Sequence, residues 1–372
     1  MVMACLSLDL QIQIGSQGLG CSFVKFTLHV GMGKAGSTAL QKFLGEEAAF
    51  LKDHRCFYLG RLLKRIPGGD WGATQTEVAK SSTMVTALEA LEEYAATPNF
   101  RKDFDHIIWS NEVLAMSPNP VRQIDALAAF FEKSTLFTSV EIVLVFRRQD
   151  DWLESAYRQW ALQNKLQPGY AVLTPEQYAE REARLLDYHA IYTAWSAKLP
   201  VRVVTFDEVK AKGGVVEYFA ELWGLNGVPE PQNYQRIRPA IGPALSALYS
   251  AFNRSYPVRM HARTAKQFVE KYRLPELSGE GQVCIPIETR AQVLARYSNS
   301  NDALAHALGR DSLFPPPTDM PLDLYTNTTE DMISYLVRIA KAQSSEIDRL
   351  RSRIIALEKS ATPSRSEPPN ED

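Results

Sequence analysis

The chain has 372 residues, in which 41 lysines and arginines nearly balance 43 aspartates and glutamates, giving a formal net charge of -2. This balance excludes a bulk field that attracts nucleic acid or an anionic membrane, so any anion site must be local. Hydrophobic residues make up 45% of the chain, enough for a large core in one or two domains.

Residues 1–23 are mildly apolar but carry no basic segment, and Asp9 interrupts the apolar run. We expect a poorly ordered leader here rather than a signal peptide. No window is long enough for a membrane span, and we expect a cytoplasmic protein. The cysteines show neither C-x-x-C nor zinc-ligand spacing, so we expect reduced thiols and no metal site. They are Cys5, Cys21, Cys56 and Cys284.

A glycine-rich loop links the first predicted strand, KFTLHV at residues 25–30, to a predicted helix at residues 37–50. This order is the first half of a βαβ unit. Gly31 and Gly36 keep the spacing of a Walker-type phosphate loop, G-x-x-x-x-G-K-[ST], but Ser37 stands where that loop has its lysine. The loop therefore resembles a phosphate-binding loop with an altered ligand set.

Lys34 lies inside this loop, where its cation can reach over a group bound at the helix end. Backbone N–H groups at the start of a helix favour anions, and the neighbouring hydroxyls add donors. These features predict a cradle for a phosphate or a similar oxyanion; the alternative is an ordinary turn with a good helix N-cap. The predicted binding residues are Gly33, Lys34, Ala35, Gly36, Ser37 and Thr38.

Further strands and helices alternate after this unit, which is typical of an α/β fold with a central parallel sheet between two helical layers. In such sheets ligands bind at the carboxyl ends of the strands. His29 and His106 lie inside predicted strands and are expected to be core residues, and residues 60–82 are expected to form a loop. The later predicted strands cover residues 104–110, 140–146 and 201–206, and the helices cover residues 83–96, 120–133, 150–163, 175–198 and 213–225.

The strand at residues 140–146 ends in arginines, whereas a nucleoside triphosphatase would place a metal-holding carboxylate at such an edge. Arg147 can offer a planar guanidinium fork to a phosphate. Its alternative role is an ion pair with Asp150 or Asp151, and Arg148 is either a second cation of the site or solvent-facing. Cations without a metal carboxylate predict a ligand with several phosphates and no metal.

Two motifs together resemble the PAPS-dependent sulfotransferases, whose donor is 3′-phosphoadenosine 5′-phosphosulfate. GKAGST is similar to their K-[ST]-G-[ST]-T loop, and RRQDDWLESAY supplies an arginine at a strand end and a serine eight residues later, Arg147 and Ser155. The resemblance covers about residues 25–160 and looks closer to the bacterial and carbohydrate-modifying members. It departs from the cytosolic members at Ala39, where they have a tryptophan, and in lacking their R-K-G segment.

The resemblance implies a P-loop-like fold, PAPS bound without a metal, and sulfuryl transfer to a hydroxyl acceptor that is a carbohydrate or a glycolipid. The loop would hold the 5′-phosphosulfate, with Lys34 neutralising the leaving oxygen, while Arg147 and Ser155 would hold the 3′-phosphate. A general base follows a later strand in this family, and Glu112 occupies that place here. Glu112 could instead be a solvated carboxylate or a helix cap, and Ser110 an N-cap or a 3′-phosphate contact.

The chain beyond residue 239 is mostly helical, and residues 24–325 are expected to form the sulfotransferase domain. YSNSNDALAHALG, at residues 297–309, resembles an element near the end of bacterial sulfotransferase-like chains. We interpret it as an Asn/Asp capping turn. Residues 360–372 are rich in proline and polar residues and are expected to be disordered.

Apolar residues repeat at alternating spacings of three and four over residues 333–357, which is typical of a coiled coil. Isoleucine at a and leucine at d favour a parallel pair, in which Glu346 of one copy attracts Arg351 of the other. We expect a coiled-coil helix at residues 330–359 and a parallel homodimer. The alternative is a single amphipathic helix packed on its own domain.

Two other classes of protein fit parts of this pattern. A nucleotide-dependent P-loop kinase with a deviant loop would need the metal carboxylate that the strand ends lack. A non-catalytic nucleotide-binding scaffold could use the coiled coil to organise partners, but both sets of ligand residues are intact.

Overall fold

The computed structural model describes the chain from residue 24 to residue 361, with internal gaps. The expected leader, residues 1–23, and residues 362–372 of the expected disordered tail lie outside the described residues. The described ranges are residues 24–117, 120–163, 169, 172–230, 234, 243–255, 262–274, 283–316 and 328–361.

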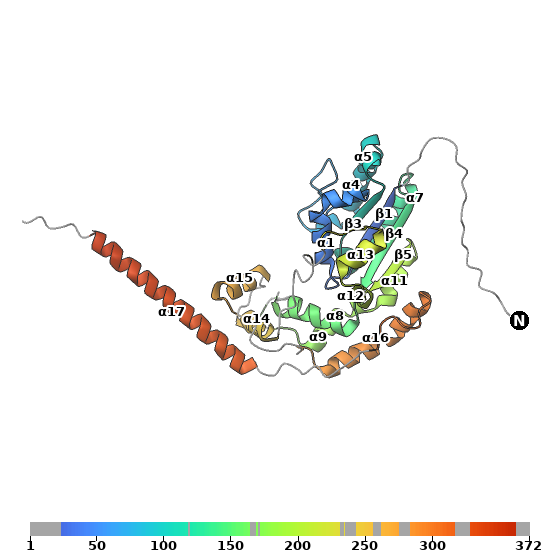
Figure 1. The fold of residues 1–372 in the computed structure, drawn as a ribbon. Helices are drawn as coiled ribbons and strands as arrows, with labels where there is room; N and C mark the ends of the chain where they lie inside the picture. The colour runs from blue at the N-terminus through green and yellow to red at the C-terminus, as the bar shows by residue number, and fades with distance from the viewer. Residues whose placement is uncertain are drawn as a thin grey trace, which may run out of the picture.

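A five-stranded sheet forms the centre of the fold (Figure 1). Its strands are β1 (Lys25–Gly31), β2 (Cys56–Tyr58), β3 (His106–Ser110), β4 (Ser139–Phe146) and β5 (Val201–Thr205). Neighbouring strands are all parallel, in the order β2-β3-β1-β4-β5. The chain fills one side of β1 first and then crosses to the other, which creates a switch point of the kind where ligands bind. The predicted α/β class and parallel sheet are confirmed.

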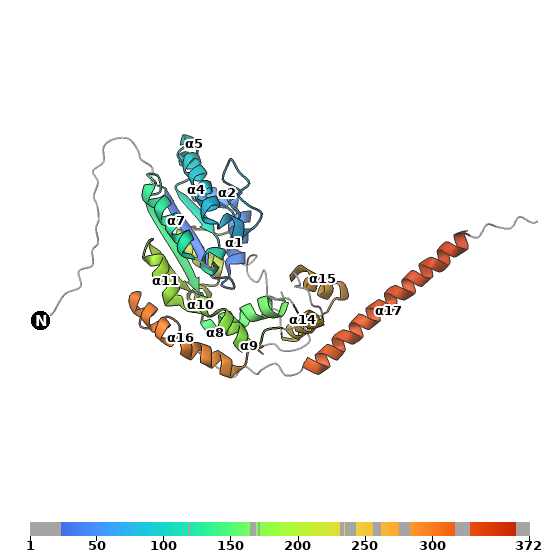
Figure 2. The same cartoon turned by 180° about the vertical axis from the view of Figure 1, so that it is seen from behind.

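Helices cover both faces of the sheet because its inner strands bury apolar residues on both sides. The main covering helices are α1 (Ser37–Glu46), α4 (Ser81–Ala95), α7 (Pro120–Lys133), α11 (Tyr188–Ser196) and α13 (Val215–Trp223). Phe26 and Leu28 of β1 pack into a core with α4, α7 and α11, whereas Val143 and Val145 of β4 pack with α1 and α13. Figure 1 shows α1 and α13 in front of the sheet, and Figure 2 shows α7 and α11 in front of the opposite face.

Three predicted helices are divided or change type in the structure. The helix expected at residues 37–50 ends at Glu46 and restarts as α2 (Ala48–Asp53). The helix expected at residues 150–163 is α8 (Gln149–Ala156) followed by the π-helix η1 (Tyr157–Gln163). The one expected at residues 175–198 is three helices, namely α9 (Pro175–Arg181), α10 (Ala183–Leu186) and α11.

Some short elements were not predicted, and capping residues explain part of them. Thr74 and Thr205 each accept a bond from the backbone three residues on, in a capping box that starts a helix without apolar periodicity. The first of these boxes places a helix inside the expected loop at residues 60–82. Besides β2, the additional elements are α3 (Gln75–Val78), α5 (Pro98–Asp103), α6 (Val113–Met116) and α12 (Phe206–Ala211).

Four helices form the described part of the chain beyond residue 239, as expected. They are α14 (Pro243–Ser255), α15 (Ala262–Tyr272), α16 (Ile287–Ala307) and α17 (Thr328–Ala361). α16 packs on α8 and α11, and α17 packs on α14 and α15 before it projects away from the rest of the chain (Figure 1). The YSNSND residues lie inside α16, so their interpretation as a capping turn is wrong. Of the helices in the described ranges, none combines the length and apolar character needed to cross a membrane.

Candidate functional site

A cavity of about 410 Å³ opens at the carboxyl edge of the sheet. Its walls come from the β1–α1 loop, the residue after β4, α8 with η1, and the turn between α12 and α13. The volume lies within the ~300–1,000 Å³ that is usual for small-molecule sites. All but one of the predicted site residues line it together: Gly33, Lys34, Gly36, Ser37, Thr38, Glu112, Arg147 and Ser155.

Ala35 is the exception, because it does not line the cavity. Its methyl group is fully buried beneath the loop, and its N–H donates to the backbone oxygen of Met32 at 3.2 Å. The loop reverses direction around it because Lys34 and Gly36 adopt left-handed backbone angles, with φ values of 75° and 87°. This reversal points the start of α1 at the cavity.

The start of α1 has no side-chain cap. Gly36 is the N-cap residue, so neither Ser37 nor Thr38 caps this helix with its side chain. The first-turn N–H groups of a helix have no partners within the helix, and here no side chain caps them. The Ser37 side chain is buried, and its Oγ has no hydrogen-bond partner among the described residues. An oxyanion at this helix end would satisfy these donors.

Lys34 is held by a residue that the sequence analysis did not single out. Its Nζ donates to Gln159 Oε1 at 2.5 Å, and Gln159 also lines the cavity. Gln159 follows Ser155 by four residues, so a helical face through Ser155 could have identified it. Its neighbour Trp160 also lines the cavity and lies so close to Gly33 that a Cβ there would approach its ring to 3.0 Å. Two consecutive residues reach the cavity from the π-helix η1.

Arg147 lies beside Lys34 without a carboxylate partner among the described residues. Its Nη1 donates to the backbone oxygen of Lys34 at 3.3 Å, and its Cζ lies 5.3 Å from the centroid of the Phe206 ring. Its buried Nε has no hydrogen-bond partner among the described residues, and burial lowers the pKa of Arg147. An arginine nevertheless stays charged, and a desolvated cation favours an anionic ligand.

The alternative role of Arg147, an ion pair with a following aspartate, is therefore wrong. Asp150 pairs with Arg148 and Arg290 instead, at 2.7 and 2.6 Å, and Asp151 pairs with Arg290 at 2.8 Å. Arg148 does not line the cavity, because its guanidinium is used by these carboxylates. Arg148 is therefore neither a second cation of the site nor a solvent-facing residue, the two roles that were expected for it.

Glu112 lines the cavity and is oriented by a neighbouring amide. Gln41 Nε2 donates both to Glu112 Oε2 and to Ser110 Oγ, each at 3.1 Å. Glu112 occupies the N-cap position of α6, but its side chain makes no capping bond, because Asn111 Oδ1 accepts the Val113 N–H at 3.0 Å. The cap interpretation of Glu112 is wrong.

Ser110 is buried and stands outside the cavity lining, so its expected roles as an N-cap or a phosphate contact are wrong. Its Oγ lies 2.9 Å from His29 Nδ1. His29 and His106 are core residues, as predicted, and burial lowers their pKa values to about 3 and about 4. Neither histidine lines the cavity.

Other wall residues come from parts of the chain that the motifs do not reach. Phe206 and Lys210 of α12, and Gly213 and Gly214 just before α13, also line the cavity. An aromatic ring is thus present, although Ala39 itself offers none. Cys56 and Cys284 are free thiols, Cys5 and Cys21 lie outside the described residues, and no cluster of three potential metal ligands occurs in the described ranges.

A scan against models of known protein families matches no family, and a search of curated proteins finds no match.

Proposed function

We propose that this chain is a PAPS-dependent sulfotransferase that acts on a hydroxyl acceptor of the carbohydrate or glycolipid class. The observation that carries the proposal is the position of Lys34 and Arg147. They line one cavity beside an uncapped helix start, and Arg147 contacts the Lys34 backbone at 3.3 Å. Two neighbouring cations suit a donor that carries a phosphosulfate and a separate phosphate.

The proposal assigns one end of the donor to each group of residues. The 5′-phosphosulfate lies at the start of α1, where the N–H groups and hydroxyls of Ser37 and Thr38 and the ammonium of Lys34 face it. The 3′-phosphate lies at Arg147, whose unsatisfied Nε supports this assignment, and at Ser155. A P-loop-like fold belongs to the same proposal, because a glycine-rich loop joins the central strand β1 to α1.

The reaction is an in-line displacement at sulfur. The acceptor oxygen forms the new S–O bond while the bond from sulfur to the bridging oxygen breaks, and 3′,5′-ADP leaves. Lys34 neutralises the negative charge that grows on that bridging oxygen. Glu112 accepts the proton of the acceptor hydroxyl, with Gln41 holding its carboxylate in place.

Titration calorimetry with 3′,5′-ADP, ADP and ATP, each with and without magnesium, tests the donor class. We expect 3′,5′-ADP to bind most tightly and without any need for magnesium, because Arg147 then has a 3′-phosphate to contact. A magnesium-dependent preference for ATP would overturn the proposal in favour of a kinase. Binding of 3′,5′-ADP without sulfuryl transfer from PAPS to any hydroxyl acceptor would favour the non-catalytic scaffold.

A further inference from the structure

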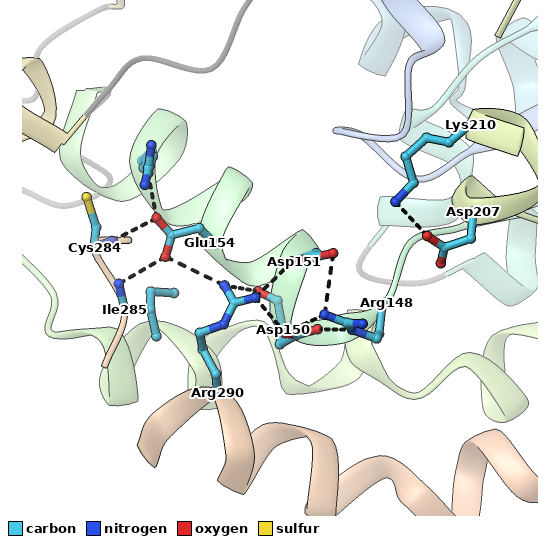
Figure 3. A network of polar contacts seen from close by, with 10 residues as sticks. Arg148, Asp150, Asp151, Glu154, Asp207, Lys210, Cys284, Ile285 and Arg290 are labelled. Carbon is cyan, nitrogen blue, oxygen red and sulfur yellow. Dashed lines mark hydrogen bonds and ion pairs between the residues drawn. The ribbon is translucent and has the colours of Figure 1, made fainter. Parts of the chain in front are cut away.

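The segment after β4 carries two arginines and two aspartates within five residues, yet only its first arginine reaches the cavity. In Figure 3 the second arginine, Arg148, contacts Asp150 and Asp151, and a side chain from α16, Arg290, lies between the carboxylates of α8. Its guanidinium contacts Asp150 Oδ2 at 2.6 Å and Asp151 Oδ1 at 2.8 Å. Arg290 is only 1% exposed, so this contact is built into the fold.

α16 holds the same segment at a second point. Asn301, three helical turns beyond Arg290 on the same face, exchanges hydrogen bonds with the Gln149 side chain at 2.6 and 3.1 Å. Asn301, one of the YSNSND residues, therefore fastens α16 to the start of α8. Glu154, one turn further along α8, accepts the N–H groups of Cys284 and Ile285, just before α16 begins.

The charges of this network balance without Arg147. Three carboxylates, those of Asp150, Asp151 and Glu154, contact three guanidinium groups, those of Arg148, Arg158 and Arg290. Arg147 is left as the surplus cation of this segment. Asp151 is the carboxylate that competes for it: burial raises the pKa of Asp151, but the charge of Arg147, together with Arg290 and Arg148, holds it below its ordinary value.

We propose that Arg290 is a positioning residue which holds Asp151 away from Arg147, so that Arg147 stays available to the 3′-phosphate of the donor. The proposal rests on the proposed function for the identity of that ligand. Without Arg290, Arg148 at 3.7 Å is the one ion-pair partner that Asp151 keeps among the described residues, and Asp151 can turn to Arg147, where it displaces the phosphate. The arrangement keeps an arginine unpaired in a segment that holds two aspartates.

Arg290→Gln is the first variant of the test, with binding of 3′,5′-ADP and of ADP as the readout. We expect the Kd for 3′,5′-ADP to rise about tenfold, as for other coupled charges, and the Kd for ADP to change little, because ADP has no 3′-phosphate. Adding Asp151→Asn should restore most of the affinity. Arg296→Gln, at an exposed arginine on the same helix paired with Glu180, is the matched control and should change neither Kd.

A general loss of structure would weaken both nucleotides and would not respond to Asp151→Asn, and this result would overturn the proposal. If Arg290→Gln does not fold, Arg290→Lys keeps one charge and should lose part of the 3′,5′-ADP affinity, again restored by Asp151→Asn. Failure of Asp151→Asn to restore binding in the folded variant also overturns it.

A ligand-free measurement separates this proposal from the proposed function. The coupling between Arg147 and Asp151, measured by urea unfolding of the single and double variants, should be larger in the Arg290 variant than in the original chain. If no adenosine bisphosphate binds the original chain, the proposed function fails while this coupling still decides the role of Arg290. An unchanged coupling overturns that role.

Discussion

Lys34 and Glu112 both line the cavity, but their surroundings assign them different parts in the proposed reaction. Lys34 stands at the uncapped start of α1, where the donor's negative charge would collect, and its Nζ is held by Gln159. Glu112 is a carboxylate and repels the negatively charged donor, so its proposed role is to act on the acceptor hydroxyl. Replacing each residue should therefore change different measured quantities.

We expect Lys34→Ala to abolish sulfuryl transfer and to weaken 3′,5′-ADP binding, because a cation beside the phosphate is lost. Glu112→Gln should keep the binding constant while kcat falls by about 10²–10⁴-fold, the usual contribution of a general base. Calorimetry and transfer assays with PAPS on both variants make the comparison. Full activity of Glu112→Gln would assign the proton transfer to another group.

The buried histidines predict how the stability of the fold depends on pH. Burial lowers the pKa values of His29 and His106 from 6.5 to about 3 and about 4. Below 6.5 the unfolded chain takes up protons that the native chain does not, so the free energy of unfolding falls as the pH falls. Each histidine contributes up to about 1.4 kcal/mol per pH unit in that window.

Urea unfolding between roughly pH 7 and pH 4.5 measures this slope. His106→Gln keeps a hydrogen-bonding group opposite Thr27 Oγ1, which lies 2.8 Å from the imidazole, and should remove about half of the histidine contribution. His306→Gln, at an exposed position on α16, is the control for the effect of a histidine-to-glutamine substitution as such. Equal slopes in the original chain and His106→Gln would contradict the argument.

At the scale of elements, the packing between the β1–α1 loop and its neighbours leads to a prediction about two glycines. A Cβ at Gly31 would lie 2.7 Å from both His29 Cε1 and Ser37 Oγ, so Gly31→Ala must displace one of these buried side chains. We expect a loss of about 1–3 kcal/mol in the free energy of unfolding, together with weaker 3′,5′-ADP binding. Urea unfolding and calorimetry measure the two effects.

Gly45, inside α1, is the matched control because a Cβ there meets nothing within 4 Å. Gly45→Ala should leave the free energy of unfolding unchanged or raise it by up to about 1 kcal/mol, since alanine is the better helix former. If Gly31→Ala left the free energy of unfolding unchanged, as expected for Gly45→Ala, the prediction that a Cβ at Gly31 displaces His29 or Ser37 would be wrong.

The elements also show how far the sequence determines the fold and the site. β1 and β4 could be predicted because strands buried on both faces read as continuous apolar runs. β2 could not, because its three residues give too short a pattern to recognise. The loop, Arg147 and Ser155 were within reach of motif spacing. Trp160 was not, because it reaches the cavity through a π-helix that no apolar period predicts.

The far wall of the cavity was out of reach for a different reason. Phe206 and Lys210 are more than 160 positions from the loop in the chain. The pairing of β5 with β4 brings α12, which follows β5, against the loop. Ala35 shows the converse limit. It sits inside the motif, yet the left-handed turns at Lys34 and Gly36 direct it into the core.

At the scale of the whole molecule, the structure shows packing of α17 on its own chain, which was one of the two alternatives for this helix. Its first turns pack on α14 and α15 through the fully buried Tyr335, with Met332 and Ile339 beside it. These residues lie off the a and d positions of the heptad. Docking on its own chain therefore leaves the predicted stripe exposed, including Ile347, which is 49% exposed. The other exposed stripe residues are Ile333, Leu336, Leu350, Ile354 and Leu357.

An exposed apolar stripe of this length is typical of a coiled-coil surface, and we propose that a second copy of the chain covers it in a parallel pair. Leu350→Glu, which places like charges at a d position of both copies, should convert the dimer to a monomer in light scattering. Ser352→Glu, at the outward f position of the same turn, adds the same charge and should leave the dimer intact.

Orientation can be tested on the same helix with Ile354→Cys. In a parallel pair residue 354 meets its own copy, so oxidation should link two chains rapidly, whereas an antiparallel pair would hold the two thiols apart. The substitution leaves Tyr335 docked on α14 and α15, so the rest of the chain serves as its own folding control. If the original protein has the mass of a single chain at micromolar concentration, the pairing is contradicted. α17 would then be an amphipathic helix that packs on its own domain alone.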